Sequence, residues 1–190
     1  KILAASPGHP GALMIMADIK AAAKDTVASI AILKEVLAAD PRNREASYDL
    51  ADWYKATGNP AATVQYEYTY NLDTTDVNPL FEIGEHYEQL KQTQKAIDAY
   101  VFCMRKDRDF TPAYIQLGKI YLSQGDNAKA LRHFNLAIQT APNSAEAYYY
   151  KGLCFSKMAQ RDSAVVALNQ ALVFDRGMKE AAEELKKLKK

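Results

Sequence analysis

The chain has 190 residues, of which 48% are hydrophobic and 25% are charged, an ordinary composition for a protein with a sizeable core. Its formal net charge of +1 excludes a strong overall attraction to nucleic acid or to an anionic membrane. No apolar run approaches the roughly 18 residues that a membrane-spanning helix needs, so direct membrane insertion is not expected.

The sequence is built from repeated units, because the same residue types return at a fixed interval. The clearest copy contains Tyr114 and Gly118, and 34 residues later (114 to 148) the sequence has Tyr148 and Gly152. A period of this length predicts supersecondary units that stack on one another, since a single helical hairpin cannot bury its own hydrophobic face.

The pattern resembles the tetratricopeptide repeat, a helix-turn-helix unit whose first helix carries an aromatic residue, Leu, Gly and Tyr. Its second helix carries Ala, an aromatic residue and Ala, to which Ala130, Phe134 and Ala137 correspond. The resemblance covers almost the whole chain. It implies an all-α fold, a right-handed superhelical α-solenoid of helix-turn-helix repeats with a C-terminal capping helix.

In chain order, residues 1–9 are expected to be the tail of a preceding repeat or a linker, since Pro7 lies 34 residues before Pro41 (7 to 41). The chain is therefore expected to be a fragment or mature domain whose N-terminal targeting region is not visible. Five tetratricopeptide-like repeats and a capping helix are predicted to follow. Their boundaries are 10–43, 44–76, 77–110, 111–144 and 145–178 for the repeats and 179–190 for the capping helix.

The first two repeats depart from the pattern. Lys20 and Ser29 replace the Tyr and Ala expected in the first repeat. The second repeat is one residue short, and the gap is placed in its internal turn. There Asn59 is predicted to cap the second helix and Pro60 to occupy the first helical position.

Three tyrosines of the second repeat, Tyr66, Tyr68 and Tyr70, alternate with polar residues as a β-strand would. The repeat register instead predicts a helix, with Tyr66 in the core and Tyr70 four residues further along the same face. Tyr68 is then expected to be a single exposed aromatic side chain.

The glycines of the repeats are interpreted as packing residues. Gly84, Gly118 and Gly152 are predicted to lie where the two helices of one repeat approach most closely, because a side chain there would push the backbones apart.

No residue pattern in the chain indicates catalysis, a cofactor or a metal. His9, His86 and His133 lie in no metal-binding motif, and phosphate-binding loops and nucleophile motifs are absent from the sequence. Cys103 and Cys154 are predicted to be buried thiols, with a disulfide or a metal pair as the alternative. The chain is therefore expected not to be an enzyme.

The register assigns a set of residues to the concave groove that first helices form in the resembled family. The first three repeats place five acids there against one lysine, whereas the last two place apolar residues such as Ile115 and Leu122 among them. The predicted partner-binding residues are Asp18, Glu45, Tyr48, Asp49, Asp52, Phe81, Glu82, Glu85, Glu88, Lys119 and Tyr149.

The acidic groove predicts a protein or peptide partner that carries Lys or Arg beside an apolar anchor, with Tyr48, Phe81 and Tyr149 as aromatic contacts. The alternative is that these acids are only a solvated helix face. An RNA partner is disfavoured by the same acids.

The groove residues argue against one known function of the family, the binding of an acidic chaperone tail. Members that hold the acidic tail of a chaperone use Lys, Arg and Asn side chains, and the corresponding positions here are Met14, Asp18, Asp49, Asn78 and Glu82. Their carboxylates would repel the carboxylates of such a ligand.

The function expected from these observations is that of a non-enzymatic scaffold or adaptor. The alternative is a self-assembly module that forms a homo-oligomer through exposed repeat ends. A soluble domain is expected, either cytoplasmic or periplasmic and envelope-associated in a bacterium; the sequence does not distinguish these compartments.

Overall fold

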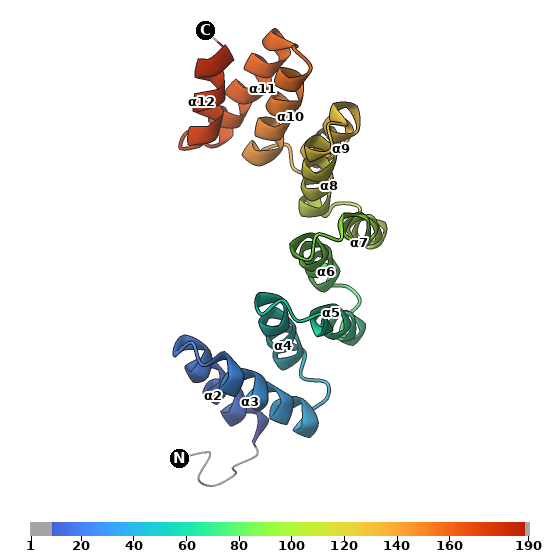
Figure 1. Cartoon of the computed structure of the whole chain (residues 1–190), viewed down its shortest axis with the longest axis vertical. Helices are drawn as coiled ribbons and strands as arrows, with labels where there is room; N and C mark the ends of the chain where they lie inside the picture. Colours follow the sequence, from blue (N-terminus) through green and yellow to red (C-terminus); the bar gives the residue numbers. More distant parts are fainter. Residues whose placement is uncertain (1–8, 189–190) are drawn as a thin grey trace. The chain divides into compact units, whose positions relative to one another are not determined.

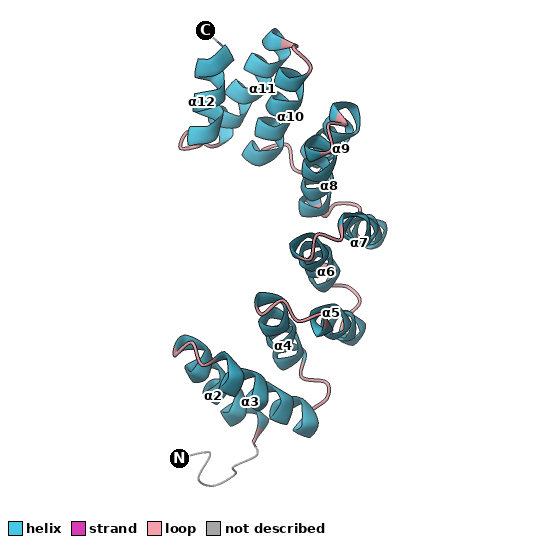
Figure 2. Ribbon diagram, viewed as in Figure 1, coloured by secondary structure: helices cyan, strands magenta, loops and turns pink. Residues whose placement is uncertain are grey.

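The computed structural model describes residues 9–188 of the chain. Within that range the chain forms eleven helices joined by short loops, and it forms no strand (Figure 2). The helices are α2 (Pro10–Ala22), α3 (Thr26–Ala39), α4 (Arg44–Ala56), α5 (Ala61–Leu72), α6 (Asn78–Gln89), α7 (Thr93–Lys106), α8 (Thr111–Ser123), α9 (Asn127–Thr140), α10 (Ala145–Lys157), α11 (Arg161–Phe174) and α12 (Lys179–Leu188). The expected tail at residues 1–8 and the last two residues of the expected capping helix lie outside the described range.

The described residues divide into two compact units, residues 9–99 and 100–188, which we call the N-terminal unit and the C-terminal unit. The boundary falls within α7. In the N-terminal unit α2 packs against α3 and α4 against α5, and each pair also contacts the next helix along the chain (Figure 1). In the C-terminal unit α8 packs against α9 and α10 against α11, with α12 resting on α10 and α11.

Close helix packing in the C-terminal unit depends on two of the predicted glycines. A Cβ atom on Gly118 would lie 2.5 Å from a ring carbon of Phe134, and one on Gly152 would lie 2.7 Å from Leu168 Cγ. Both distances are too short for any larger residue without displacement of the neighbour. The packing role predicted for these two glycines is confirmed.

The turn inside each helix pair contains one residue with positive φ. These residues are Lys24, Gly58, Lys91, Gly125 and Ala159, with φ between 57° and 80°. Left-handed backbone at this point ends the first helix and reverses the chain. The recurrence of this conformation from pair to pair gives every pair the same turn.

The short second repeat is accommodated at the start of its second helix. The Asn59 side chain accepts a hydrogen bond from the Ala61 N–H at 2.9 Å, but the N-cap of α5 is Pro60, one residue later than predicted. Pro60 already has helical angles, φ −62° and ψ −15°, but α5 itself begins at Ala61. As a result α5 has 12 residues where α3, α9 and α11 have 14.

Packing of the tyrosines in α5 follows the helical prediction. Tyr66 is fully buried and Tyr70 is buried on the same face, whereas Tyr68 is 40% exposed. The Tyr68 hydroxyl donates a hydrogen bond to the Pro41 carbonyl oxygen at 2.5 Å, so this exposed ring also ties α5 to the loop before α4.

The cores contain the residues that the repeat register places inside. Cys103 and Cys154 are buried as predicted, and burial raises the pKa of the Cys154 thiol to about 11. At the C-terminal end, Ala181 and Leu185 of α12 pack against Leu168. The last turn of α12 is basic, which complements the helix dipole.

Two apolar residues assigned to the groove belong to the core instead. Ile115 and Leu122 are 6% and 8% exposed and pack in one cluster with Phe134. Their predicted place on an open surface is wrong, because both side chains are buried in a cluster that contains residues of α9 and α10, where apolar burial is favourable.

Candidate functional site

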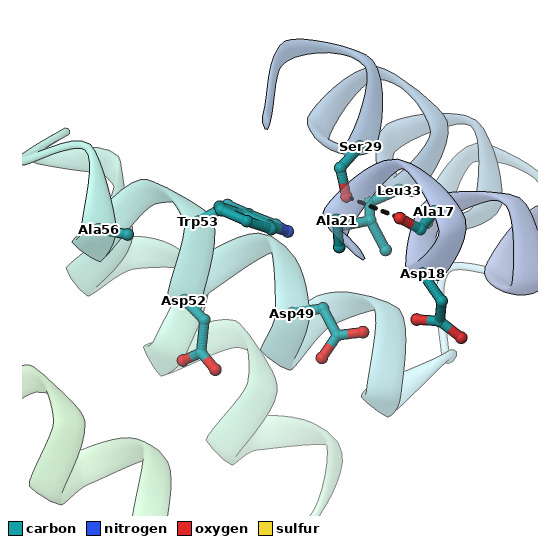
Figure 3. A pocket seen from close by; sticks show the side chains of 9 residues that line it. All are labelled: Ala17, Asp18, Ala21, Ser29, Leu33, Asp49, Asp52, Trp53 and Ala56. Carbon is teal, nitrogen blue, oxygen red and sulfur yellow. Dashed lines mark hydrogen bonds between the residues drawn. The ribbon is translucent and has the colours of Figure 1, made fainter. Parts of the chain in front are cut away.

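An open pocket of about 320 Å³ lies between α2, α3 and α4 in the N-terminal unit (Figure 3). Asp18 of α2 and Asp49 and Asp52 of α4 form a row of carboxylates along one side, below the ring of Trp53. No lysine or arginine lines the pocket. Its full lining is Ala17, Asp18, Ala21, Ser29, Leu33, Asp49, Asp52, Trp53 and Ala56, and we call it the acidic pocket.

Helical spacing brings these side chains together. Asp49, Asp52, Trp53 and Ala56 occupy positions i, i+3, i+4 and i+7 of α4 and therefore share one face. The floor is closed by Ser29, which is 1% exposed and donates a hydrogen bond to the Ala17 carbonyl at 3.2 Å. The space above that floor is open because small alanines of α2 face it.

Burial and the neighbouring acids both act on the Asp49 carboxyl. Burial, followed by the charges of Glu45, Asp18 and Asp52, raises the pKa of Asp49 to about 6. Neighbouring carboxylates and partial desolvation both disfavour the ionised form. A cation in the acidic pocket would offset the repulsion and favour the ionised form of Asp49.

Asp52 also has a structural role. It accepts a hydrogen bond from the hydroxyl of the buried Tyr66 at 2.5 Å. The Tyr48 ring packs edge-on against Tyr66 with centroids 5.7 Å apart, so the predicted contact residue Tyr48 lies half-buried beside the same network. Burial and the nearby carboxylates raise the pKa of both tyrosines well above the ordinary value.

The acids of α6 are arranged differently from those of the acidic pocket. The Lys55 ammonium lies 2.5 Å from a carboxylate oxygen of Glu82 and 2.5 Å from one of Glu85. Burial alone lowers the pKa of Lys55, but the hydrogen bonds to the two glutamates outweigh it and raise the pKa. Lys55 therefore neutralises much of the charge that the sequence assigns to this part of the groove.

The remaining predicted residues of the N-terminal unit lie near these two clusters. Glu45 is exposed in the first turn of α4, and Phe81 and Glu88 are half-buried on α6. A second open pocket of about 280 Å³ lies between α4 and α6, lined by Asp52, Lys55, Ala56, Glu82 and Gln89.

Lys119 and Tyr149 belong to the C-terminal unit and form no part of the acidic pocket. The Lys119 ammonium lies 3.9 Å from Glu146 and 5.5 Å from the centroid of the Tyr150 ring. Tyr149 packs in the hydrophobic cluster between α10, α11 and α12. Both side chains thus have contacts within the chain.

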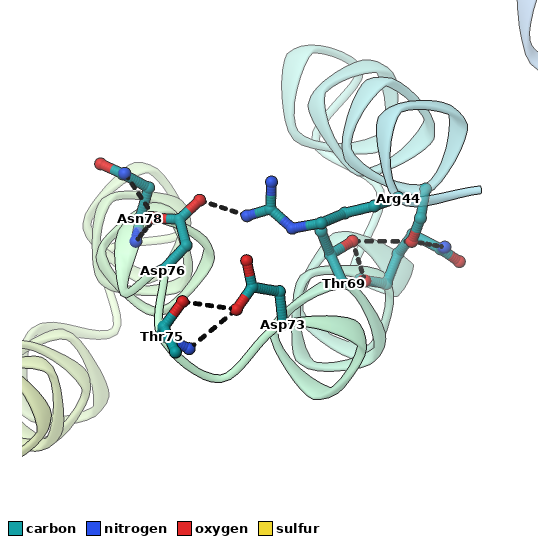
Figure 4. Close-up of polar contacts among 8 residues, drawn as sticks. Arg44, Thr69, Asp73, Thr75, Asp76 and Asn78 are labelled. Atoms are coloured by element: carbon teal, nitrogen blue, oxygen red, sulfur yellow. Dashed lines mark hydrogen bonds and ion pairs between the residues drawn. The ribbon is translucent and has the colours of Figure 1, made fainter. Parts of the chain in front are cut away.

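An ion pair that the sequence reasoning missed braces α4 against the loop before α6. Arg44 binds Asp76, which also accepts a hydrogen bond from the Asn78 N–H at 2.9 Å (Figure 4). Burial alone raises the pKa of Asp76, but these hydrogen bonds outweigh it and lower the pKa. In the same loop Asp73 accepts a hydrogen bond from the Thr75 N–H at 3.0 Å.

The sequence reasoning also missed Trp53. A detectable signal was present, because the one tryptophan of the chain lies four residues after Asp49 on a predicted helix. A row of carboxylates that lines an open pocket next to an indole offers both charge and a π-face to a cationic group.

The described residues show no group of His, Cys, Asp and Glu that could hold a metal ion. His86 is fully buried on α6, and burial lowers the pKa of its imidazole, as expected of a neutral side chain in a helix interface. Among residues 9–188, none of the helices has the length and apolarity needed to cross a membrane.

Three family models match the chain, one described as "TPR repeat" over residues 118–158 and two as "Tetratricopeptide repeat" over residues 20–62 and 146–190. Among curated proteins, the BBSome complex member BBS4 of Bos taurus is 31% identical over 116 residues, which cover 60% of this chain and 22% of the bovine protein. The chain therefore spans about a fifth of the length of the curated relatives it matches.

Solved structures share the fold. The crystal structure of MamA protein superposes with a TM-score of 0.70 and 29% identity over 88% of this chain and 92% of that one. The first TPR of Spaghetti (RPAP3), bound to the HSP90 peptide SRMEEVD, has a TM-score of 0.58 and 23% identity over 62% of this chain and 93% of that one. With its paired helices, packing glycines and matching family models, the chain belongs to the tetratricopeptide-repeat family.

Proposed function

We propose that this chain acts as a non-enzymatic protein-interaction scaffold whose acidic pocket holds a Lys or Arg side chain of a partner segment. One observation carries the proposal: Asp18, Asp49 and Asp52 line a single open pocket that has no cation of its own. Coulomb attraction between three carboxylates and one guanidinium is large where the site is partly screened from water.

The contrast with α6 supports this choice of pocket. Glu82 and Glu85 already have a cation in Lys55, so a partner would have to displace an internal ion pair there. The acidic pocket has no such competitor, and Trp53 adds an aromatic face for the incoming cation. Tyr48 and Phe81, both half-buried, are the apolar contacts proposed for a neighbouring side chain of the partner.

The similarity to known proteins supports a role as a protein-interaction scaffold. The chemistry of the ligand is proposed from the residues of this chain. The fold is shared with a protein that binds a peptide, and that likeness extends to the fold alone. The acidic peptide named for that neighbour is a poor match for the pocket here, because Asp18 and Asp49 would repel its carboxylates.

The proposal is tested with two acetylated heptapeptides that differ only in a central Arg or Glu between leucines. At low salt we expect the Arg peptide to bind and the double variant Asp18→Asn, Asp49→Asn to weaken it about tenfold, or about 1.4 kcal/mol. The matched control is Glu35→Gln, Glu67→Gln, which removes two charges from exposed positions of the same unit outside the pocket. Equal binding of both peptides, or undiminished binding by the pocket variant, would refute the mechanism.

A second candidate function, self-assembly, is favoured by one specific observation on α2. Ile15 and Ile19 are 59% and 61% exposed, although the residues that correspond to Ile19 in α8 and α10, Ile120 and Cys154, are 4% and 0% exposed. An apolar face that is covered elsewhere in the fold can stack on a second copy.

Light scattering across protein concentration tests this second function. Self-assembly predicts a mass that grows with concentration and returns to the monomer value in the variant Ile15→Ser, Ile19→Ser. A concentration-independent monomer mass for the unaltered protein would eliminate it.

A further inference from the structure

A second kind of pocket, of about 600 Å³, lies between α10 and α11 in the C-terminal unit. Like the acidic pocket, it is open to solvent. The lining residues are Tyr148, Lys151, Phe155, Asp162, Ser163, Val166, Ala167 and Gln170, and we call it the α10–α11 pocket.

In the preceding helix pair, α8 and α9, side chains fill the space that corresponds to this pocket. In α8 and α9 the Tyr121 ring stacks on His133, with centroids 5.4 Å apart. The Lys129 ammonium lies over the same ring, 5.3 Å from its centroid. The aromatic residue at the end of the first helix is thus covered by two long side chains of the second.

In α10 and α11 the covering side chains are missing. Phe155 follows Tyr121 by 34 residues (121 to 155), and the residues 34 beyond Lys129 and His133 are Ser163 and Ala167. Neither is long enough to reach across the ring, so one side of Phe155 faces the pocket. The rim is apolar as well, because Val166 is 70% exposed.

Lys151 supplies the positive charge of the pocket. It follows Leu117 by 34 residues (117 to 151), and Leu117 is fully buried in its own helix pair. Lys151 is half-buried, and among the described residues it makes no hydrogen bond or ion pair. Lys151 therefore occupies a position that is buried in the preceding repeat, lines the pocket and has no internal partner within residues 9–188. Such a lysine can bind an anionic group of a ligand.

Asp162, the acidic residue of the pocket, is stabilised by its position in its own helix, whereas Lys151 has no such stabilisation. Asp162 lies in the first turn of α11, where a carboxylate interacts favourably with the helix dipole. The charge left to be complemented is therefore positive.

The α10–α11 pocket is separate from the predicted groove. Lys151 and Tyr149 are two residues apart on one helix and point to nearly opposite sides of it, because successive residues rotate by about 100°. A ligand in this pocket would consequently leave the groove face of α10 open.

We infer that the α10–α11 pocket binds a segment of a partner protein that presents an apolar side chain next to a carboxylate. The apolar side chain packs on Phe155 and Val166, and the carboxylate accepts hydrogen bonds from the Lys151 ammonium. This inference goes beyond the proposed function, since it involves neither the acidic pocket nor a cationic partner group.

The test uses NMR titration of the isotope-labelled chain with acetylated peptides whose central pair is Phe-Glu, Phe-Gln or Ala-Glu. We expect saturable shifts of the Val166 methyl and Phe155 ring signals with the Phe-Glu peptide and binding at least about fivefold weaker for the other two. Lys151→Leu, which restores the residue type of the preceding repeat, should bring the Phe-Glu peptide to the affinity of the Phe-Gln peptide. Ala167→His, which restores the cover over the ring, should abolish binding of all three.

Asn169→Lys is the matched control, because Asn169 is exposed on the same helix and does not line the pocket. It should bind like the unaltered chain. The inference is overturned if no peptide gives saturable shifts at these residues, or if Lys151→Leu leaves the preference for Glu over Gln intact. Should Ala167→His fail to fold, the Lys151→Leu result alone decides the matter, and the acidic pocket plays no part in either outcome.

Discussion

Each of the two units has a pocket, and the two pockets arise from different departures from the same repeat pattern. In the N-terminal unit, three carboxylates gather around an open space in front of small alanines, and no described lysine or arginine lines that space. In the C-terminal unit, the side chains that cover an aromatic ring in one helix pair are shortened in the next, which leaves an apolar hollow beside a lysine. Surface chemistry can therefore diverge between repeats whose buried positions stay alike.

The largest expected effect concerns the packing on which the C-terminal pocket depends. Gly152→Ala should destabilise the chain by about 1–3 kcal/mol, because the new Cβ would lie 2.7 Å from Leu168 Cγ and 3.3 Å from a backbone nitrogen. Gly11→Ala on α2 should change stability by less than about 0.5 kcal/mol, since its Cβ meets only the His9 side chain at 3.3 Å. Chemical denaturation followed by circular dichroism measures both, and equal effects would contradict the packing account.

A smaller effect is expected where Lys55 separates the α6 acids from the acidic pocket. Lys55→Met should destabilise the chain by about 1–2 kcal/mol, because Glu82 and Glu85 lose their shared cation in a half-buried position. The same variant should bind the Arg peptide more tightly, since the acids become available to a partner. Lys55→Arg serves as the charge-preserving control, and a loss of peptide affinity in Lys55→Met would count against the contrast between the two clusters.

Substitution of Asp49 is expected to stabilise the chain, whereas the two preceding substitutions destabilise it. Its pKa is raised in the folded chain, from 3.8 to about 6, so the folded state binds this proton more tightly than the unfolded state and loses stability as pH rises through that interval. Asp49→Asn should therefore stabilise the chain at pH 7, by about 1 kcal/mol after solvent screening, and flatten the pH dependence between 4 and 6. Denaturation at pH 4, 5, 6 and 7 checks this, with Glu35→Gln as the control expected to change neither.

The smallest effect is expected at the groove positions of the C-terminal unit. Glu146→Gln removes the carboxylate that lies 3.9 Å from Lys119, in a pair whose side chains are 50% and 35% exposed. We expect a change in the unfolding free energy of no more than about 0.5 kcal/mol. A loss above about 1.5 kcal/mol would mean that this pair stabilises the unit in a way its exposure does not suggest.

Much of the fold could be predicted because the 34-residue period links each position to a packing role. Gly118, Gly152 and Tyr66 occupy the close approaches and core positions that the register assigns to them. Ile115 and Leu122 could not be placed correctly, because a position that faces the groove in general can still be covered by a neighbouring helix in a particular repeat.

The candidate site could be predicted only in outline. The register brings the acids to one side of the N-terminal unit. It does not show that Lys55 of α4 reaches Glu82 and Glu85 on α6, the first helix of the next repeat. That contact depends on the distance between helices and on the rotamer of a long side chain. The α10–α11 pocket was also hidden, since a hollow appears only when Ser163 and Ala167 are compared with the side chains that cover Tyr121.

The proposed site for a partner cation consists of the carboxylates of Asp18, Asp49 and Asp52. Measuring the pKa of the Asp49 carboxyl by NMR, in the free chain and in the chain saturated with the Arg heptapeptide, tests this site most sharply. We expect a pKa near 6 in the free chain, which falls by about one unit or more when the guanidinium occupies the pocket. An Asp49 pKa that is the same with and without the peptide, under conditions where the peptide is bound, would contradict it.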